Sequence, residues 1–165
     1  MKKLTMLAVC AFALALPIIG GTKAQPNIVT VSVMQVAQID NLDKDFLKAD
    51  RADFYAEVLI DGQWTRTSVW HGQDVLRPGW RITNIVWGDT TTIRIRLFDF
   101  DTGSSGRDDW CDINPLRGER ELTLVYNTVN GRITGDVNGY RGEPLTVKGS
   151  GDGMRAEITF TINHL

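Results

Sequence analysis

The chain has 165 residues, with 18 basic and 20 acidic side chains and a formal net charge of −2 at neutral pH. This length suits a single domain with one hydrophobic core. The slightly acidic balance argues against sequence-blind binding of nucleic acid, which needs a basic surface. Zinc is not expected, because the only histidines, His71 and His164, have no ligand spacing around a cysteine.

Residues 1–24 are typical of a bacterial secretory signal peptide. The basic start MKK is followed by the apolar run LTMLAVCAFALALPIIGG, and Thr22 and Ala24 stand where a signal peptidase reads small residues. We therefore expect cleavage after Ala24 and a secreted or periplasmic protein formed by residues 25–165. A retained membrane anchor is the alternative, because the apolar run is near the length that spans a bilayer.

Cleavage changes the charge and the cysteine content. Residues 1–24 hold three lysines and no acid, so the mature chain has a net charge of about −5. It keeps Cys111 as its single cysteine, so it has no internal disulfide. We expect Cys111 to be a small buried hydrophobe.

The mature chain alternates apolar and polar residues in short runs. NIVTVSVMQV places Val29, Val31 and Val33 on one face. DFYAEVLIDG and WTRTSVW are joined at the hairpin signal Asp61-Gly62, and WRITNIVW and TTIRIRLF are separated by Gly88-Asp89. RELTLVYNTVNGRITGDV contains a further hairpin signal, Asn130-Gly131, and GMRAEITFTINHL ends the chain with a last alternating run.

This pattern predicts an all-β fold. Period-2 alternation with closely spaced turn signals is typical of an antiparallel sandwich or barrel. We expect a Greek-key β-sandwich of about eight strands over residues 25–165. The side chains expected to fill its core, in some combination, are those of Trp64, Trp70, Trp80, Trp87 and Trp110.

The stretch FDFDTGSSGRDDWCDINP allows two interpretations. Its Asp101-Thr102-Gly103 resembles the signature of pepsin-like aspartic proteases, which need two carboxylates about 3 Å apart sharing one proton. This chain has one such triplet, so only a dimer would supply the second carboxylate. The additional acids of the stretch would crowd a site that holds a single shared proton. The protease is therefore kept as a minor alternative.

A metal site is the other interpretation. Period 2 aims Asp99 and Asp101 the same way at the end of a strand, and the polar loop that follows can return Asp108 and Asp109 to them. Clustered carboxylates repel one another, and a hard cation such as Ca²⁺, which takes six to eight oxygens, removes that repulsion. An EF-hand is excluded, because the positions that need glycine and glutamate hold other residues.

A second acidic segment strengthens the metal interpretation. It lies between two predicted strands and carries Asp40, Asp43, Asp45, Asp50 and Asp53. AQIDNLD resembles the end of a long strand that opens a calcium loop, and ADFYAEVLIDG resembles the signature SDPYVKV, with Phe54 in place of proline. LRPGW resembles an Asn-Pro-x-Trp turn, and IRLFDFDTGSSGRDDWCDINP resembles the stretch that completes the calcium site. From Val29 to about Pro115 the chain thus resembles the C2 domain family, the calcium-dependent phospholipid-binding β-sandwich of synaptotagmins and protein kinases C.

The resemblance implies a ligand set in two loops, with a third loop from His71 to Gly79. The implied calcium ligands are Asp43, Asp53, Asp99, Asp101 and Asp109. The longer first loop leaves Asp45 and Asp50 as alternatives to Asp43, and Asp108 is an alternative to Asp109. Asp112 departs from the family pattern, which has glycine after the apolar pair.

The expected function is calcium-dependent binding outside the cytoplasm by a monomer. The partner implied by the resemblance is an anionic phospholipid membrane surface, and another extracytoplasmic protein is an alternative. A structural or adhesive module that calcium stiffens is the second hypothesis. No Ser-His-Asp arrangement or phosphate-binding glycine loop is present, so an enzyme is not expected.

Overall fold

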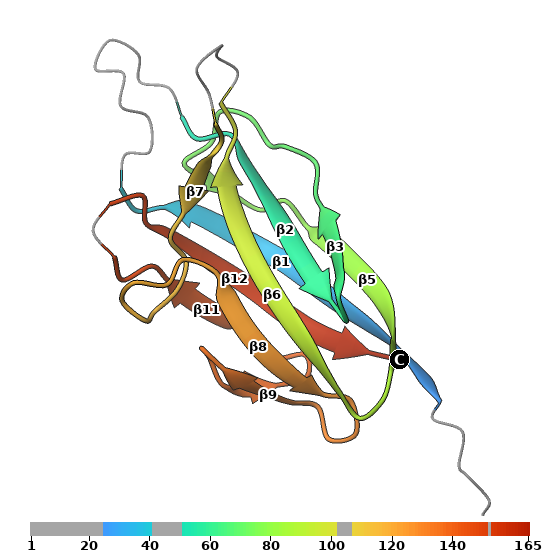
Figure 1. Cartoon of the computed structure of the whole chain (residues 1–165). Coiled ribbons are helices and arrows are strands. Elements are labelled where there is room, and N and C mark those ends of the chain that lie inside the picture. The colour runs from blue at the N-terminus through green and yellow to red at the C-terminus, as the bar shows by residue number, and fades with distance from the viewer. Residues whose placement is uncertain (1–24, 41–50, 102–106, 152) are drawn as a thin grey trace, which may run out of the picture.

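The computed structural model describes residues 25–40, 51–101, 107–151 and 153–165. Every regular element in these ranges is a β-strand, and twelve strands form two antiparallel sheets that lie face to face (Figure 1). The all-β class and the antiparallel sandwich are confirmed. Several strands are only two to four residues long, which raises the number above the eight or so that alternation in the sequence resolves.

The first sheet is built around β1, which pairs with three other strands. Its order is β11-β12-β1-β4, and β5 also pairs with β1. The strands are β1 (Pro26–Gln38), β4 (Val75–Leu76), β5 (Trp80–Trp87), β11 (Leu145–Lys148) and β12 (Ala156–His164). The chain therefore begins and ends its described part on neighbouring central strands.

The second sheet is built around β6, which pairs with β2, β7 and β8. Its order is β10-β9-β8-β6-β2-β3, with β7 beside β6. The strands are β2 (Phe54–Ile60), β3 (Gln63–Arg66), β6 (Thr90–Asp99), β7 (Asp109–Cys111), β8 (Leu122–Asn127), β9 (Arg132–Gly135) and β10 (Gly139–Tyr140). The predicted hairpin at Asp61-Gly62 joins β2 to β3, and both residues have the positive φ that a type I′ turn requires.

The core lies between the two sheets and is formed by the alternating positions. The first sheet contributes Val29, Val31 and Val33, which are fully buried. Cys111, on β7 of the second sheet, is also fully buried, as expected. The second sheet contributes Ile93, Ile95 and Leu97 from β6, also fully buried. Burial of each such side chain stabilises the fold by roughly 1.5–3 kcal/mol.

Of the five tryptophans expected to fill the core in some combination, one does so. Trp80 is buried, whereas the other four are 37% to 66% exposed. The run WRITNIVW has apolar residues at both parities, and its inward positions are taken by Trp80, Ile82 and Val86. Trp87 therefore points outward.

The predicted signal peptide, residues 1–24, and residues 41–50 of the first acidic loop lie outside the described residues. Within the described ranges, no helix is long and apolar enough to cross a membrane.

Candidate metal centre

The two acidic segments meet at one end of the sandwich. The end of β1, the start of β2, the end of β6 and the start of β7 all lie there (Figure 1). Phe54, the first residue of β2, pairs with Asp99, the last residue of β6. The strand register thus places Asp53, next to Phe54, beside the acidic end of β6.

Asp53 and Asp99 are joined directly. The backbone N–H of Asp53 donates to Asp99 Oδ1 at 2.6 Å, and the N–H of Phe100 donates to the carbonyl oxygen of Asp53 at 2.8 Å. Asp99 is only 3% exposed. A buried carboxylate is stable only when hydrogen-bond donors or a cation offset its charge.

The loop from His71 to Gly79 is tied to the same carboxylate. His71 Nδ1 lies 2.8 Å from Asp53 Oδ2, and the backbone N–H of Gly72 donates to Asp53 Oδ1 at 2.6 Å. Both oxygens of Asp53 are thus hydrogen-bonded to this loop. Sequence reasoning gave His71 no role, because alternation describes strands and says nothing of how a loop folds back.

Asp109 shares a face with Asp99. The two residues are direct partners across β6 and β7, so their side chains project to the same side of the sheet. Like charges in this arrangement are destabilising. Asp101, two residues beyond Asp99, has a raised pKa because of burial and the negative charges of Asp109, Asp108 and Asp53. These carboxylates therefore repel one another in the described structure.

Asp108 lies on the outer side of the sheet. Its Oδ2 accepts a hydrogen bond of 2.6 Å from the Tyr55 hydroxyl and is 3.6 Å from Arg66 Nη2, and its Oδ1 is 3.4 Å from the N–H of Asp101. Burial and the bond to Asp108 raise the pKa of Tyr55. The Arg66 guanidinium also covers the Tyr55 ring, 3.6 Å from its centroid.

Asp40 closes the root of the first acidic loop. Its carboxylate accepts bonds from Arg155 Nη2 at 2.7 Å, Arg155 Nε at 2.9 Å and the Arg155 backbone at 3.0 Å. These hydrogen bonds hold the pKa of Asp40 below its usual value. Asp40 is therefore engaged with Arg155, next to β12, which argues against a ligand role.

The other first-loop candidates, Asp43, Asp45 and Asp50, lie outside the described residues. Among the residues that are described, no group of three or more acidic, histidine or cysteine side chains is already arranged to hold a metal ion. The side chains at this end nevertheless fit a hard cation. Their carboxylates repel one another, and calcium prefers oxygen ligands.

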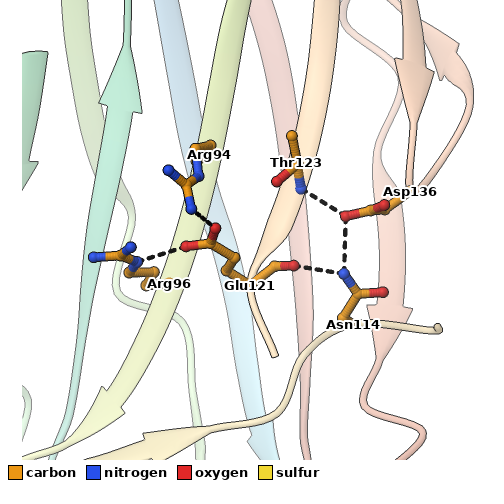
Figure 2. A network of polar contacts seen from close by, with 6 residues as sticks. All are labelled: Arg94, Arg96, Asn114, Glu121, Thr123 and Asp136. Atoms are coloured by element: carbon orange, nitrogen blue, oxygen red, sulfur yellow. Dashed lines mark hydrogen bonds and ion pairs between the residues drawn. The ribbon is translucent and has the colours of Figure 1, made fainter. Parts of the chain in front are cut away.

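A polar network holds the connection from β7 to β8 (Figure 2). The Glu121 carboxylate lies between the guanidiniums of Arg94 and Arg96, and the Arg96 Nε bond is 2.6 Å long. Asn114 Nδ2 donates to the carbonyl oxygen of Glu121 and, at 2.8 Å, to Asp136 Oδ2. The two arginines, which project outward from β6, are thus already paired with an acid.

Comparisons with known proteins give the class of the fold. No protein-family model matches the chain, and no curated protein matches it in sequence. Among solved structures, it is similar to a C2 domain of plant extended synaptotagmin 1, with a TM-score of 0.55, 12% identity and coverage of 87% of this chain and 96% of that one.

Two further similar structures are larger proteins. A structure with two C2 domains of extended synaptotagmin 2 gives a TM-score of 0.54 at 12% identity over 99% of this chain and 48% of that one. Human GIVD cytosolic phospholipase A2, in complex with methyl gamma-linolenyl fluorophosphonate, gives 0.54 at 13% identity over 86% of this chain. The match spans 17% of the phospholipase. This chain is a β-sandwich with a C2-like fold.

Proposed function

We propose that this chain is an exported calcium-binding module whose acidic end binds an anionic phospholipid surface when calcium is present. The observation that carries the proposal is the repulsion among acids at this end. Asp99 is paired with Asp109 across β6 and β7, and burial together with the charges of Asp109, Asp108 and Asp53 raises the pKa of Asp101. A C2-like fold supports it, and one similar structure, of extended synaptotagmin 2, is calcium bound.

The residues that would hold the ion come from two loops. They are Asp53, Asp99, Asp101 and Asp109, with Asp43 from the first acidic loop, for which Asp45 and Asp50 are alternatives. The register favours Asp109 over Asp108, because Asp108 faces Tyr55 and Arg66. Bound calcium would supply positive charge that offsets the repulsion among these carboxylates and attracts lipid phosphate.

Thermal melting of residues 25–165 in EDTA and in calcium tests the metal site. A site with a dissociation constant of roughly 10⁻⁴–10⁻³ M would stabilise the fold by about 1.4–2.7 kcal/mol in 10 mM calcium. This corresponds to a rise in melting temperature of about 4–10 °C. Equal magnesium should give a much smaller rise, and the Asp99→Asn/Asp101→Asn variant should give none. A chain that melts identically in EDTA and calcium contradicts the proposal.

Vesicle sedimentation tests the lipid partner. Vesicles of phosphatidylcholine and phosphatidylserine should carry the chain down in calcium but not in EDTA, and pure phosphatidylcholine should carry little. Calcium-dependent melting without vesicle binding would instead support the structural or adhesive module. Proteolysis with an acid optimum that Asp101→Asn abolishes, and that calcium does not affect, would support the dimeric aspartic protease.

A further inference from the structure

The end of the sandwich opposite the acidic loops carries a concentration of exposed apolar side chains. Trp87 is 66% exposed, Val129 72% and Tyr140 61%, which are among the largest values for large apolar residues in the described ranges. Exposed single hydrophobics are normal, but a cluster at one end marks a contact surface.

On the first sheet, exposed apolar side chains of β1 and β5 form a continuous strip on the outer face. Ile28 of β1 and Ile85 of β5 are direct partners in the register, and Trp87 is the partner of Pro26. Ile28 is 42% exposed and Ile85 53%. Partners across two strands project to the same face, so Trp87 lies diagonally beside Ile28.

Two hydrogen bonds connect this strip to the second sheet. The Thr128 backbone N–H donates to the carbonyl oxygen of Asp89, and its hydroxyl donates to that of Gly88, both at 2.8 Å. These bonds fix the turn that carries Val129 against the turn that follows Trp87. Tyr140 belongs to the same end, because it pairs with Arg132, just beyond that turn.

The place of the apolar run in the sequence, just before β1, bears on what covers this surface. The uncharged run that ends at Gly21 precedes Pro26 by five residues, a span of at most about 18 Å. Pro26 is itself part of the apolar strip. A bilayer that holds the run therefore lies within reach of Trp87. Tryptophan and tyrosine are the side chains enriched at membrane–water interfaces, and Arg132 stands beside Tyr140 to meet lipid phosphate.

We infer that, in the chain that keeps residues 1–24 as a membrane anchor, this end of the sandwich is a membrane-contact surface, which docks without calcium on the bilayer that holds residues 4–21. The acidic end of the sandwich then faces away from that bilayer, because the ends of β1 and β6 lie at the other end of the strands (Figure 1). This surface is separate from the calcium-dependent end proposed above, and neither requires the other.

Quenching of tryptophan fluorescence by brominated lipid tests the inference on the full chain. Residues 1–24 contain no tryptophan, so every quenched tryptophan belongs to the folded domain. Residues 1–165 would be reconstituted into vesicles of brominated phosphatidylcholine and phosphatidylglycerol in EDTA, which keeps the calcium loops out of the measurement. We expect Trp87→Phe to remove more than half of the quenching. The matched control is Trp70→Phe, which changes a tryptophan that bridges Phe54 at the acidic end of the sandwich and should leave the quenching unchanged.

A second variant tests whether a second copy of the chain, rather than a bilayer, covers the strip. Ile85→Glu places a charge on an exposed position, so the fold should persist, as circular dichroism would show, while quenching of Trp87 falls severalfold. Equal quenching in the Trp87→Phe and Trp70→Phe variants would overturn the inference. So would a dimer in detergent that Ile85→Glu splits, because the strip would then be an interface between two copies of the chain.

Discussion

His164 lies between a tyrosine and an arginine near the end of β12. Its Nδ1 is 2.5 Å from the Tyr126 hydroxyl oxygen, and Arg141 Nη1 is 3.1 Å from its Nε2. A guanidinium only donates, so Nε2 accepts and the neutral ring carries its proton on Nδ1. Burial, and then the positive charge of Arg141, lower the pKa of His164.

This lowered pKa predicts that acid destabilises the protein. Between the folded pKa and the unfolded value of about 6.5, the unfolded state binds more protons than the native state. The contribution of His164 is therefore complete above about pH 6.5 and is lost as the pH falls, with a limiting slope of about 1.4 kcal/mol per pH unit. Urea unfolding in EDTA at pH 7.5 and pH 5.5 measures this loss.

His164→Gln is the comparison, because glutamine does not titrate. The variant should lose less stability than the wild type between the two pH values. Identical losses in the two proteins would contradict the assignment of this pH dependence to His164.

At the acidic end, the sequence predicted some of the site residues and not others. Period 2 at the end of β6 predicted that Asp99 and Asp101 act together, and burial at Asp99 agrees with an inward face. The choice between Asp108 and Asp109 needed the register of β7 against β6, which no spacing in the sequence supplies. His71 was missed because its contact with Asp53 depends on how a loop folds back, which residue spacing does not reveal.

At the scale of elements, Asp112 replaces the glycine of the C2 pattern and fastens two segments together. Its Oδ2 accepts the N–H of Gly151 at 2.6 Å, and its Oδ1 accepts the N–H of Asn114 at 2.9 Å. Its backbone bonds to Met154 and Ala156 join the same segments. The carboxylate is 2% exposed, so these donors are its main compensation.

Asp112→Asn should therefore be costly. The amide keeps the size of the side chain but turns an N–H toward a backbone N–H, which leaves a buried donor without an acceptor. We expect a loss of about 1–3 kcal/mol in the free energy of unfolding. Urea denaturation measures it, with the exposed Glu119→Gln as the control variant. A midpoint within error of the wild type would show that the two segments hold without this carboxylate.

The strands themselves were predictable because burial imposes period 2. Val29, Val31 and Val33 are buried as alternation requires. The turns at Asp61-Gly62 and Asn130-Gly131 join paired strands, whereas Gly88-Asp89 carries the chain from β5 in the first sheet to β6 in the second. The tryptophans were not predictable, since hydrophobicity does not choose a face. Trp64 and Trp110 lie on the outer side of the second sheet, where the Arg96 guanidinium is 4.3 Å and 5.5 Å from their ring centroids. A cation–π contact with an arginine stabilises an aromatic ring on the surface, without burial in the core.

At the scale of the whole molecule, the two ends of the sandwich are expected to respond differently to calcium. Calcium binding should order the loops around Asp53, Asp99 and Asp109 and leave the turn at Val129 unchanged, because that turn lies at the other end of the strands. Amide hydrogen exchange with and without 5 mM calcium measures this. Exchange should slow at residues 71–72 and 99–101 and stay the same at residues 127–132. Equal protection at both ends would indicate global stabilisation instead.

The length of β6 sets the distance between these two ends. It has 10 residues, so it spans about 33 Å at 3.3 Å per residue. In physiological salt this is about four Debye lengths, over which the surface potential of an anionic membrane decays to a few per cent of its value. Anionic lipids concentrate divalent cations only in that thin layer. A domain standing on its apolar end would thus hold its acidic loops outside the layer, where they report the bulk calcium concentration rather than that at the supporting membrane.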